Sequence, residues 1–527
     1  MNLPTDYIRQ IENLFGGDAP CILDSYEKPA LHCLRLNDTH VADVAAKADT
    51  AAAVAVAAAA ADTLKACSLL EEDAESVPWE PRGFYYNEAS HPGRHILHEA
   101  GFYYIQEASA MAPVALLSPS PGDRVLDLCA APGGKSTQIG AYLGGRGLLV
   151  SNEPHPTRAA ILSENIERMG ICNAVVTSEK PDALVSHFPL FFDKILVDAP
   201  CSGEGMFRKN DAAVTEWSPD NVRRCRIRQT EILESAHLML RPGGKLCYST
   251  CTFSREENET VIEAFLVKHP EYRIVPPMLC GGMRSSGSFD FAAGSSAAGC
   301  VRLLPGFVQG EGHFVALLEK ASGVVSFERE ESTGRNKASS SVRKKKSDRS
   351  DGYLSLLPSW MPFDEHMPNK DCFFLMGTQL YLLPPGTPSL EGIRVLRPGL
   401  HLGTLEKDRF KPALALARAM TTDSSAGFAL KLNVDLKQSP TQECVSVLSH
   451  DYTFCNVIGL NYVNLSMCDP SDRALLAGYF QGQVLSYEGE KGWYLIMADG
   501  RGVGWGKLSG GIIKNHYPKG LRKQLDF

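Results

Sequence analysis

The sequence predicts an α/β protein whose largest part is a doubly wound, mostly parallel β-sheet. Between residues 106 and 320, short apolar runs typical of buried strands alternate with segments of helical periodicity. A glycine-rich turn follows the first of these runs, and each run ends in a polar residue or a cysteine. Ligands of such sheets bind outside the carboxyl ends of the strands. We therefore expect a functional site along that edge.

The expected elements follow one another in a regular order. Apolar runs predict strands at 123–129, 147–153, 192–199 and 244–251, and helical patterns lie between them at 157–169 and 222–240. The residues at the strand ends are Cys129, Glu153, Asp198 and Cys251. Because the carboxyl ends of parallel strands meet at one edge, these four side chains are expected to line one site.

The length of 527 residues suggests about three domains, because single domains typically have roughly 150 residues. Changes in composition place the boundaries. We expect an N-terminal α+β domain at 1–105, the doubly wound domain at 106–322, a polar linker at 323–352, an accessory domain at 353–470 and a small β-rich domain at 471–527. The alanine-rich tract from Ala51 to Ala61 is interpreted as an insertion in a helical stretch.

The overall charge excludes one class of protein and leaves another open. With 53 Lys and Arg against 61 Asp and Glu, the net charge of −8 argues against a uniformly basic coat for nucleic acid. Basic groups at Arg223–Arg228 and Lys514–Lys523 are nevertheless candidates for contact with an RNA backbone. An alternative that the sequence supports nearly as well is that both groups are exposed basic side chains of structural elements that contact no RNA.

The 15 cysteines indicate a reducing compartment and no metal centre. No two of them have the Cys-x-x-Cys spacing that zinc sites favour. The first residues lack the apolar core of a signal peptide, and the most apolar tract is too short to cross a bilayer. We expect a cytoplasmic protein with neither a metal nor a membrane contact.

The glycine-rich turn lies within LDLCAAPGGKSTQI, from Leu126 to Ile139. Residues 134–136 fit the end of a phosphate-binding P-loop, but Cys129 stands where that motif needs its first glycine. The Gly-x-Gly-x-x-Gly pattern of dehydrogenases is missing. A third interpretation is an S-adenosylmethionine turn, which needs an acid after the second strand to bind the ribose hydroxyls. Glu153 stands at that position.

Two further motifs place a cysteine directly after a buried strand. DAPCSGEGMFRK, at 198–209, contains Cys201, and YSTCTFSREENE, at 248–259, contains Cys251. A lone cysteine is usually a small, buried, apolar residue. Loops at the ligand edge of an α/β sheet are, however, where reactive groups are placed, so we interpret both thiols as chemical groups.

With these motifs the chain resembles the Nop/Sun family of RNA cytosine-5 methyltransferases, and especially its bacterial members that act on small-subunit ribosomal RNA. Further matches are YIQEASAM at 104–111, GEGHFVALL at 310–318 and GWGKLSGGIIKNHYPKGLR at 504–522. The resemblance implies a Rossmann-like core that uses S-adenosylmethionine, an N-terminal RNA-binding extension and a C-terminal PUA-like domain. It also implies RNA as the partner; we expect a monomer.

The resemblance assigns roles to individual residues. Cys251 is implied as the nucleophile that adds to carbon 6 of cytosine and makes carbon 5 reactive. Asp198 would hold the cytosine ring, Cys201 would assist product release, and Lys209 is a candidate for substrate contact or a solvated lysine. Ser178 stands where the family usually has Asp or Asn beside the adenine. The implied cofactor contacts are Cys129, Ala130, Ala131, Pro132, Gly133, Gly134, Lys135, Glu153, Arg158, Ser178 and Asp198.

Three alternatives stay open beside the expected methylation of carbon 5 of cytosine in 16S ribosomal RNA. A transfer-RNA cytosine-5 methyltransferase would carry the same motifs. A non-catalytic RNA-binding factor for ribosome assembly would keep the fold, but it would not need both Cys201 and Cys251. A P-loop ATPase is disfavoured by Cys129.

Overall fold

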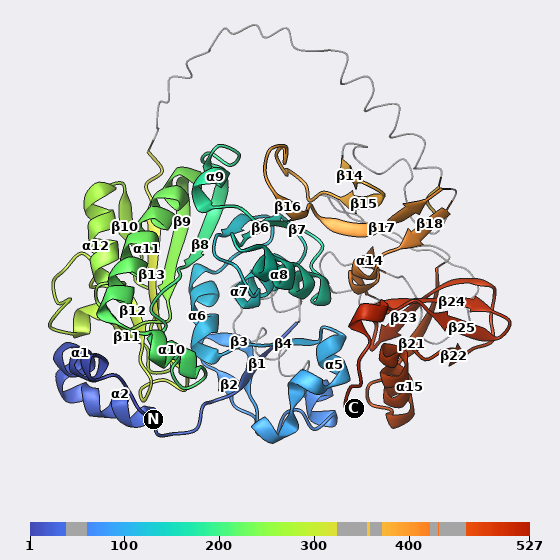
Figure 1. Ribbon diagram of the computed structural model, residues 1–527, viewed down its shortest axis with the longest axis horizontal. Helices are drawn as coiled ribbons and strands as arrows, with labels where there is room; N and C mark the ends of the chain where they lie inside the picture. Colours follow the sequence, from blue (N-terminus) through green and yellow to red (C-terminus); the bar gives the residue numbers. More distant parts are fainter. Residues whose placement is uncertain (38–60, 324–355, 359–371, 408, 422–429, 432–459) are drawn as a thin grey trace, which may run out of the picture.

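The computed structural model describes most of the chain, as Figure 1 shows. The described residues are 1–37, 61–323, 356–358, 372–407, 409–421, 430–431 and 460–527. The alanine-rich tract before residue 61 and all but the first residue of the predicted linker at 323–352 lie outside them. Residues 61–66, within the predicted helical stretch, are helical.

A central mixed sheet confirms the predicted α/β class (Figure 1). Its parallel strands are β5 (Arg124–Asp127), β6 (Leu148–Asn152), β7 (Ala174–Thr177), β8 (Phe192–Asp198) and β9 (Leu240–Thr250). They lie in the order β9-β8-β5-β6-β7, so the first strand in the chain is in the middle. The four strands expected from the apolar runs are all present, and their carboxyl ends share one edge.

Antiparallel strands extend this sheet beyond β9. They are β10 (Tyr272–Ile274), β11 (Arg284–Ser285), β12 (Val301–Leu303) and β13 (His313–Lys320). β13 lies between β9 and β12, and it pairs with β9 through Phe314 opposite Thr250. The start of β13 therefore lies at the same edge as the end of β9.

Helices cover both faces of the sheet, as a doubly wound fold requires. One face carries α6 (Ala108–Leu117), α7 (Gly134–Leu143) and α8 (Pro156–Arg168); the other carries α9 (Pro181–Val185), α11 (Pro219–Met239) and α12 (Glu259–Lys268). Neighbouring strand residues serve opposite faces: Leu149 packs with the first group of helices and Val150 with the second. Burial on both faces explains why the strands appear in the sequence as unbroken apolar runs.

The sheet ends in a strand that the sequence did not predict. β16 (Val395–Arg397) comes from the segment predicted as an accessory domain, and it pairs antiparallel with β7. Arg397 also bonds the hydroxyl of Ser163 and forms an ion pair with Glu167, both on α8. A strand from the C-terminal half thus completes the doubly wound sheet.

The N-terminal region has two parts that flank the central sheet. Helices α1 (Thr5–Phe15) and α2 (Ala19–Ser25) pack with the segment around Phe207 and Trp217, next to α10 (Asp211–Glu216). A sheet of four strands follows, and in space these strands lie in the order β2-β3-β1-β4. In the sequence, α5 comes between β3 and β4. The bounds are β1 (Cys33–Leu36), β2 (Ser76–Val77), β3 (Glu80–Tyr85), α5 (Ile96–Glu99) and β4 (Tyr103–Ile105).

The C-terminal half adds two further sheets, at the right of Figure 1. The first comprises β14 (Phe373–Met376), β15 (Gln379–Leu382), β17 (Leu400–Glu406) and β18 (Arg409–Pro412). The second comprises β19 (Met420–Thr421), β20 (Leu430–Lys431), β21 (Asn461–Leu465), β22 (Leu485–Ser486), β23 (Gly492–Ala498), β24 (Arg501–Ser509) and β25 (Ile512–Asn515). Two helices, α14 (Leu414–Arg418) and α15 (Pro470–Gln481), accompany them.

The last of these units shares its core with the N-terminal region. Leu97 of α5 and Phe480 of α15 belong to one buried apolar cluster. The buried carboxylate of Glu99 pairs with Arg418 at 2.9 Å and with Lys523 at 2.7 Å, and it accepts a hydrogen bond from Tyr517. The N-terminal region and the last unit of the chain therefore pack against each other through apolar contacts and ion pairs. Among the described residues, no helix is long and apolar enough to span a membrane.

Candidate active site

Two loops at the carboxyl edge of the sheet bring Cys201 and Cys251 together. β8 ends at Asp198 and β9 at Thr250, and the loops after these neighbouring strands place the two Sγ atoms 3.3 Å apart. Both thiols are half-buried. The N–H of Gly205 donates to the carbonyl of Cys251 at 2.7 Å, which fastens one loop to the other. The structure thus joins the two thiols that the sequence singled out.

A buried carboxyl group links the same two loops. Glu257 accepts hydrogen bonds from the N–H and the hydroxyl of Ser202, at 3.0 and 2.5 Å, and from the Gln229 amide at 2.8 Å. The Ser202 hydroxyl also lies 2.9 Å from that of Thr252. Burial raises the pKa of Glu257 to about 7, despite the hydrogen bond from Ser202. Because Ser202 and Thr252 each follow a cysteine, this network holds the sulfur pair.

Asp198, the last residue of β8, presents a carboxylate that is held from two sides. Its Oδ2 accepts a hydrogen bond from Lys135 Nζ at 2.8 Å, and its Oδ1 accepts one from the Ser249 hydroxyl at 2.8 Å. His313 Nε2 lies 3.5 Å from the same Oδ1. Burial alone would raise the pKa of Asp198, but Lys135 and His313 hold it well below its usual range. The carboxylate is therefore an anion and a hydrogen-bond acceptor at neutral pH.

The surroundings of the two cysteines differ. The contact with Cys251 and burial both raise the pKa of the Cys201 thiol, so this thiol stays protonated at neutral pH. Burial alone would lower the pKa of Lys135, but Asp198 and, to a smaller extent, Cys251 raise it. The protonated Cys201 thiol is therefore a hydrogen-bond donor 3.3 Å from the Cys251 sulfur, and the Lys135 ammonium is a cation at the same edge.

The glycine-rich turn and Glu153 form the other half of the edge. Gly133 has φ of +117°, a conformation that other residues rarely adopt, and α7 begins at the next residue without a side-chain cap. Its first N–H groups are therefore available to a ligand. The Glu153 carboxylate is buried, pairs with Arg158 at 3.2 Å and accepts the N–H of His155 at 2.9 Å. Its remaining lone pairs suit the two hydroxyls of a ribose, so these residues fit an adenosyl cofactor.

Three of the expected cofactor residues, Arg158, Ser178 and Cys129, have side chains in different settings. Arg158 joins Glu153 to the turn, because it also donates to the Ala131 carbonyl at 2.9 Å. The Ser178 hydroxyl lies 3.4 Å from the carbonyl of Pro154, and its N–H donates to the carbonyl of Arg394 beside β16. Burial raises the pKa of the Cys129 thiol, so that side chain is a small apolar group. Direct contact of these three with a cofactor stays a prediction.

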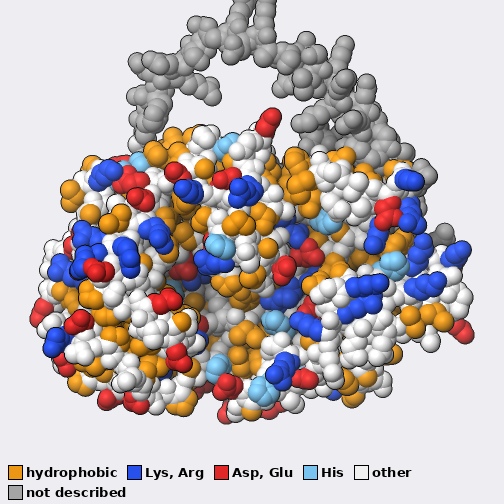
Figure 2. Space-filling model, viewed as in Figure 1, with side chains coloured by type: hydrophobic (Ala, Val, Ile, Leu, Met, Phe, Trp, Pro, Cys, Tyr) orange, Lys and Arg blue, Asp and Glu red, His pale blue; other side chains and the backbone are white. Residues whose placement is uncertain are grey.

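The basic groups expected to meet RNA lie in different settings. The four arginines at 223–228 are exposed on the first half of α11, and Arg223 pairs with Asp220. In the C-terminal tail Lys514 and Lys519 are exposed, but the ring of Tyr517 is buried and unavailable for stacking on a base. Figure 2 shows Lys and Arg side chains gathered over the C-terminal region at the right of this face. The exposed cations there include Arg409, Lys411, Lys507 and Lys514.

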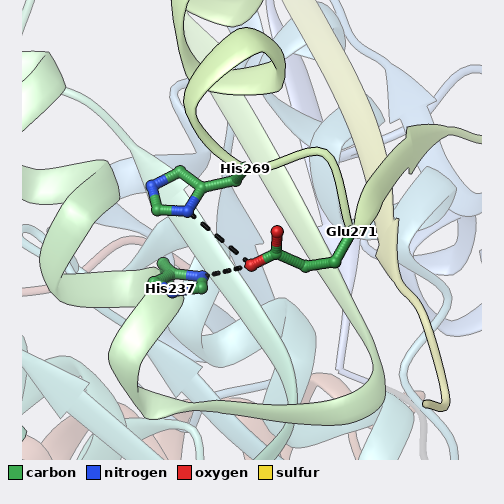
Figure 3. Close-up of side chains that lie close together, drawn as sticks. All are labelled: His237, His269 and Glu271. Carbon is green, nitrogen blue, oxygen red and sulfur yellow. Dashed lines mark ion pairs between the residues drawn. The ribbon is translucent and has the colours of Figure 1, made fainter.

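A second cluster of titratable groups lies at the opposite edge of the sheet (Figure 3). The Nδ1 atoms of His237 and His269 each lie 3.7 Å from the same oxygen of Glu271. Their rings lie against each other at an interplanar angle of 33°, with centroids 4.0 Å apart. His269 Nε2 is 3.2 Å from Glu234, and His237 Nδ1 is 3.2 Å from the Tyr272 hydroxyl. These polar groups have partners within the chain, so we assign no ion to them, and the expectation of a protein without metal stays a prediction.

Sequence reasoning missed several residues around the thiols. Ser249, Glu257 and His313 have no role in the expectations drawn from the motifs. All three lie inside the motifs YSTCTFSREENE and GEGHFVALL. The motifs were recognised, but nothing in the sequence indicated a role for these three residues. Their partners come from other strands, and the pairing of strands decides which residues meet. Lys135 bonds to Asp198, and its expected contact with the cofactor stays a prediction.

The fold and this edge define a class of protein. The strand order, the glycine turn after the first parallel strand and the acid after the second are those of a Rossmann-like methyltransferase core. The description "16S rRNA methyltransferase RsmB/F" matches residues 114–319, and "N-terminal domain of 16S rRNA methyltransferase RsmF" matches residues 3–108. Two more descriptions match the C-terminal half, "RsmF rRNA methyltransferase first C-terminal domain" at 361–420 and "Methyltransferase RsmF PUA domain" at 470–523. These four matches assign successive segments of the chain to descriptions of RsmB/F- or RsmF-type 16S rRNA methyltransferases.

Curated proteins and solved structures agree with this assignment. Ribosomal RNA small subunit methyltransferase F of Klebsiella pneumoniae is 40% identical over 255 residues, which are 47% of this chain and 52% of that protein. The protein of the same name from Pectobacterium atrosepticum is 36% identical over 260 residues, with the same coverage. The matches thus span about half the length of these curated relatives. The crystal structure of PH0851 superposes with a TM-score of 0.50 and 27% identity, covering 60% of this chain and 66% of that one.

Proposed function

We propose that this protein transfers a methyl group from S-adenosylmethionine to carbon 5 of a cytosine in small-subunit ribosomal RNA. The observation that carries the proposal is the sulfur pair: Cys201 and Cys251 lie 3.3 Å apart beside an anionic Asp198. A structural role needs neither thiol at this edge. The likeness to methyltransferases named for the small ribosomal subunit supports the choice of RNA.

The residues that would hold the cofactor lie along the edge from β5 to β7. The α7 N-terminus and Glu153 would bind it, and Arg158 would brace both. When bound there, S-adenosylmethionine supplies an electrophilic methyl group. Lys135 and Asp198 separate this half of the edge from the thiols.

The chain's own groups then account for the activation of cytosine. The Cys251 thiolate adds to carbon 6, a carbon–sulfur bond forms, and the electron pair of the 5,6 double bond makes carbon 5 nucleophilic. Asp198 accepts a hydrogen bond from the exocyclic amine and so orients the ring. After the methyl group is in place, a base removes the proton from carbon 5, the carbon–sulfur bond breaks and the Cys251 thiolate returns. Cys201, at 3.3 Å, is placed to exchange a proton with that sulfur.

The substrate base must be unpaired or extruded from its helix to reach Cys251, at a cost of roughly a few kcal/mol. Cationic side chains that bind phosphates offset such a cost. The arginines of α11 begin a short distance along the chain after the Cys201 loop, and their exposure suits this task. The lysines of the C-terminal unit would extend the contact surface.

The proposal is tested by mapping 5-methylcytosine in ribosomal RNA with bisulfite, in cells with and without this protein. We expect one or a few small-subunit cytosines to lose the modification without it. Purified small subunits and transfer RNA, each incubated with the protein and labelled S-adenosylmethionine, separate the two substrate classes. Label on transfer RNA alone would favour the alternative substrate, and no label on either RNA would contradict the proposal.

A further inference from the structure

A buried histidine beside Asp198 has a polar atom without a hydrogen-bond partner. The side chain of His313, the first residue of β13, is 5% exposed. Its Nδ1 lies 3.0 Å from the Gly312 carbonyl, which can only accept, so Nδ1 carries a hydrogen. Its Nε2 makes no hydrogen bond to the described residues, and it lies 3.5 Å from Asp198 Oδ1. A lone pair at Nε2 would face the lone pairs of a carboxylate, whereas a second proton there would be attracted to it.

The loop that carries His313 is fixed by the first turn of α6. The N–H of Glu311 donates to Glu107 at 2.8 Å, and the N–H of Gly312 donates to the Ser109 hydroxyl at 2.9 Å. Ser109 in turn donates to Glu107 at 2.5 Å. Gly312 has φ of +101°, and a Cβ there would lie 2.5 Å from the ring of Phe253. The motifs YIQEASAM and GEGHFVALL therefore meet and leave His313 little freedom.

The same loop is also tied to the Cys201 motif. Arg208 donates to the Glu311 carboxylate at 2.6 Å and to the Gly310 carbonyl at 3.1 Å. Both side chains of this ion pair are largely buried, and a buried, charge-assisted hydrogen bond orients its partners firmly. The imidazole of His313 thus comes from a segment that is anchored to both sides of the site.

We propose that His313 is a positioning residue for Asp198, with a hydrogen on Nε2 that holds Oδ1 in the orientation that meets the cytosine. This inference rests on the proposed function, since it concerns the same carboxylate. Lys135 holds the other oxygen, so donors on both sides would fix the plane of the carboxylate. The amino group of the cytosine then meets a carboxylate that cannot rotate. A misplacement of about 1 Å in such an arrangement can lower a rate by about a hundredfold.

The test measures the rate at which the covalent enzyme–RNA adduct forms. In a Cys201→Ala background the adduct with unmodified small subunits is followed on denaturing gels. Adding His313→Phe, which keeps the bulk but removes the donor, should slow adduct formation by about tenfold to a hundredfold. The affinity for RNA should change by less than about twofold, because His313 is buried away from the surface. His313→Gln, whose amide nitrogen occupies the place of Nε2, should restore most of the rate.

A matched control is His401→Phe, in the C-terminal half. His401 is also a histidine whose buried Nε2 lacks a partner among the described residues, but it lies on β17 of another sheet and stacks on Tyr381. Its adduct rate should equal that of the parent. If His313→Phe misfolds, Ser109→Ala tests the same chain of contacts, and a slower adduct rate is again expected.

The outcomes separate the two proposals. If Cys201→Ala traps no adduct and the wild type transfers no methyl group, the proposed function fails. If the parent traps the adduct and His313→Phe does so at the same rate, the role of His313 is overturned. That role is also overturned if His313→Gln is as slow as His313→Phe, because then the donor at Nε2 is irrelevant.

Discussion

The two edges of the central sheet handle their polar groups in opposite ways. At the carboxyl edge, Cys201, Cys251 and Asp198 are gathered by loops and retain capacity for new bonds, and His313 Nε2 lacks a partner among the described residues. At the opposite edge, His237, His269 and Glu271 are paired with one another and with Glu234 (Figure 3). The difference shows that clustering alone does not mark a site. A ligand site is indicated by polar groups that are held in place but lack some of the hydrogen-bond partners that they can take.

The largest effect that this contrast predicts comes from Cys251→Ala. Without the thiolate no carbon–sulfur bond can form, so methyl transfer should fall by at least about a thousandfold, as it does when other nucleophiles are removed. Cofactor affinity should be unchanged, because Glu153 and the glycine turn remain. A methyl-transfer assay and cofactor titration measure both. Transfer at the wild-type rate would sink the assignment of Cys251.

Cys201→Ala should act later in the reaction. The adduct should form but break down slowly, because the neighbouring thiol that exchanges a proton with Cys251 is gone. The protein–RNA complex should then survive denaturation and appear as a retarded gel band, while turnover falls. Cys225→Ala, on α11, is a control that should give no band. Full turnover without a band in Cys201→Ala would exclude the release role.

Glu153→Ala should weaken cofactor binding by about tenfold to a hundredfold. Hydrogen bonds to a charged group are worth about 1.5–3 kcal/mol, and each 1.4 kcal/mol is a factor of about ten. Isothermal titration with S-adenosylmethionine measures the dissociation constant. Glu164→Ala, on α8, provides the matched control. Equal affinity in the two variants would remove Glu153 from the cofactor site.

Glu257→Gln should change how stability depends on pH. Burial raises the pKa of Glu257 to about 7 in the folded protein, above its ordinary value. Its contribution is therefore complete below the ordinary glutamate pKa and is lost as the pH rises through about 7. The amide does not titrate, so between about pH 5 and pH 8 the wild type should lose about 2–3 kcal/mol more than the variant. Urea unfolding at both pH values measures this, and parallel profiles would refute it.

The smallest effect is expected at the opposite edge. His237→Phe removes one partner of Glu271 but keeps an aromatic ring beside His269, so the free energy of unfolding should fall by about 1 kcal/mol. Methyl transfer should not change, because this edge holds no group of the proposed reaction. If His237→Phe lost methyl transfer while keeping the stability of the wild type, the proposed difference between the two edges would be wrong.

Local sequence patterns predicted the parallel strands and the site residues that directly follow them. The strands ending at Asp198 and Thr250 are apolar runs closed by polar loops, a pattern that needs no knowledge of distant residues. The contacts of Ser249 and His313 with Asp198 depend on which strands pair and in what register. β16 was missed for the same reason. Its three residues lie far from β7 in the sequence, and nothing in their local pattern indicates that they pair with that strand.

The pairing of β16 with β7 has a consequence for the order in which the protein matures. The parallel strands leave the ribosome long before Val395, so the nascent sheet carries an open edge at β7 during much of synthesis. Such an edge invites pairing with other chains. A shortened protein that stops at residue 320 would keep the thiols and the cofactor turn and still lack the strand that closes its sheet. Within the folded chain, three residues of the C-terminal half cover the edge of the central sheet that would otherwise be open at β7.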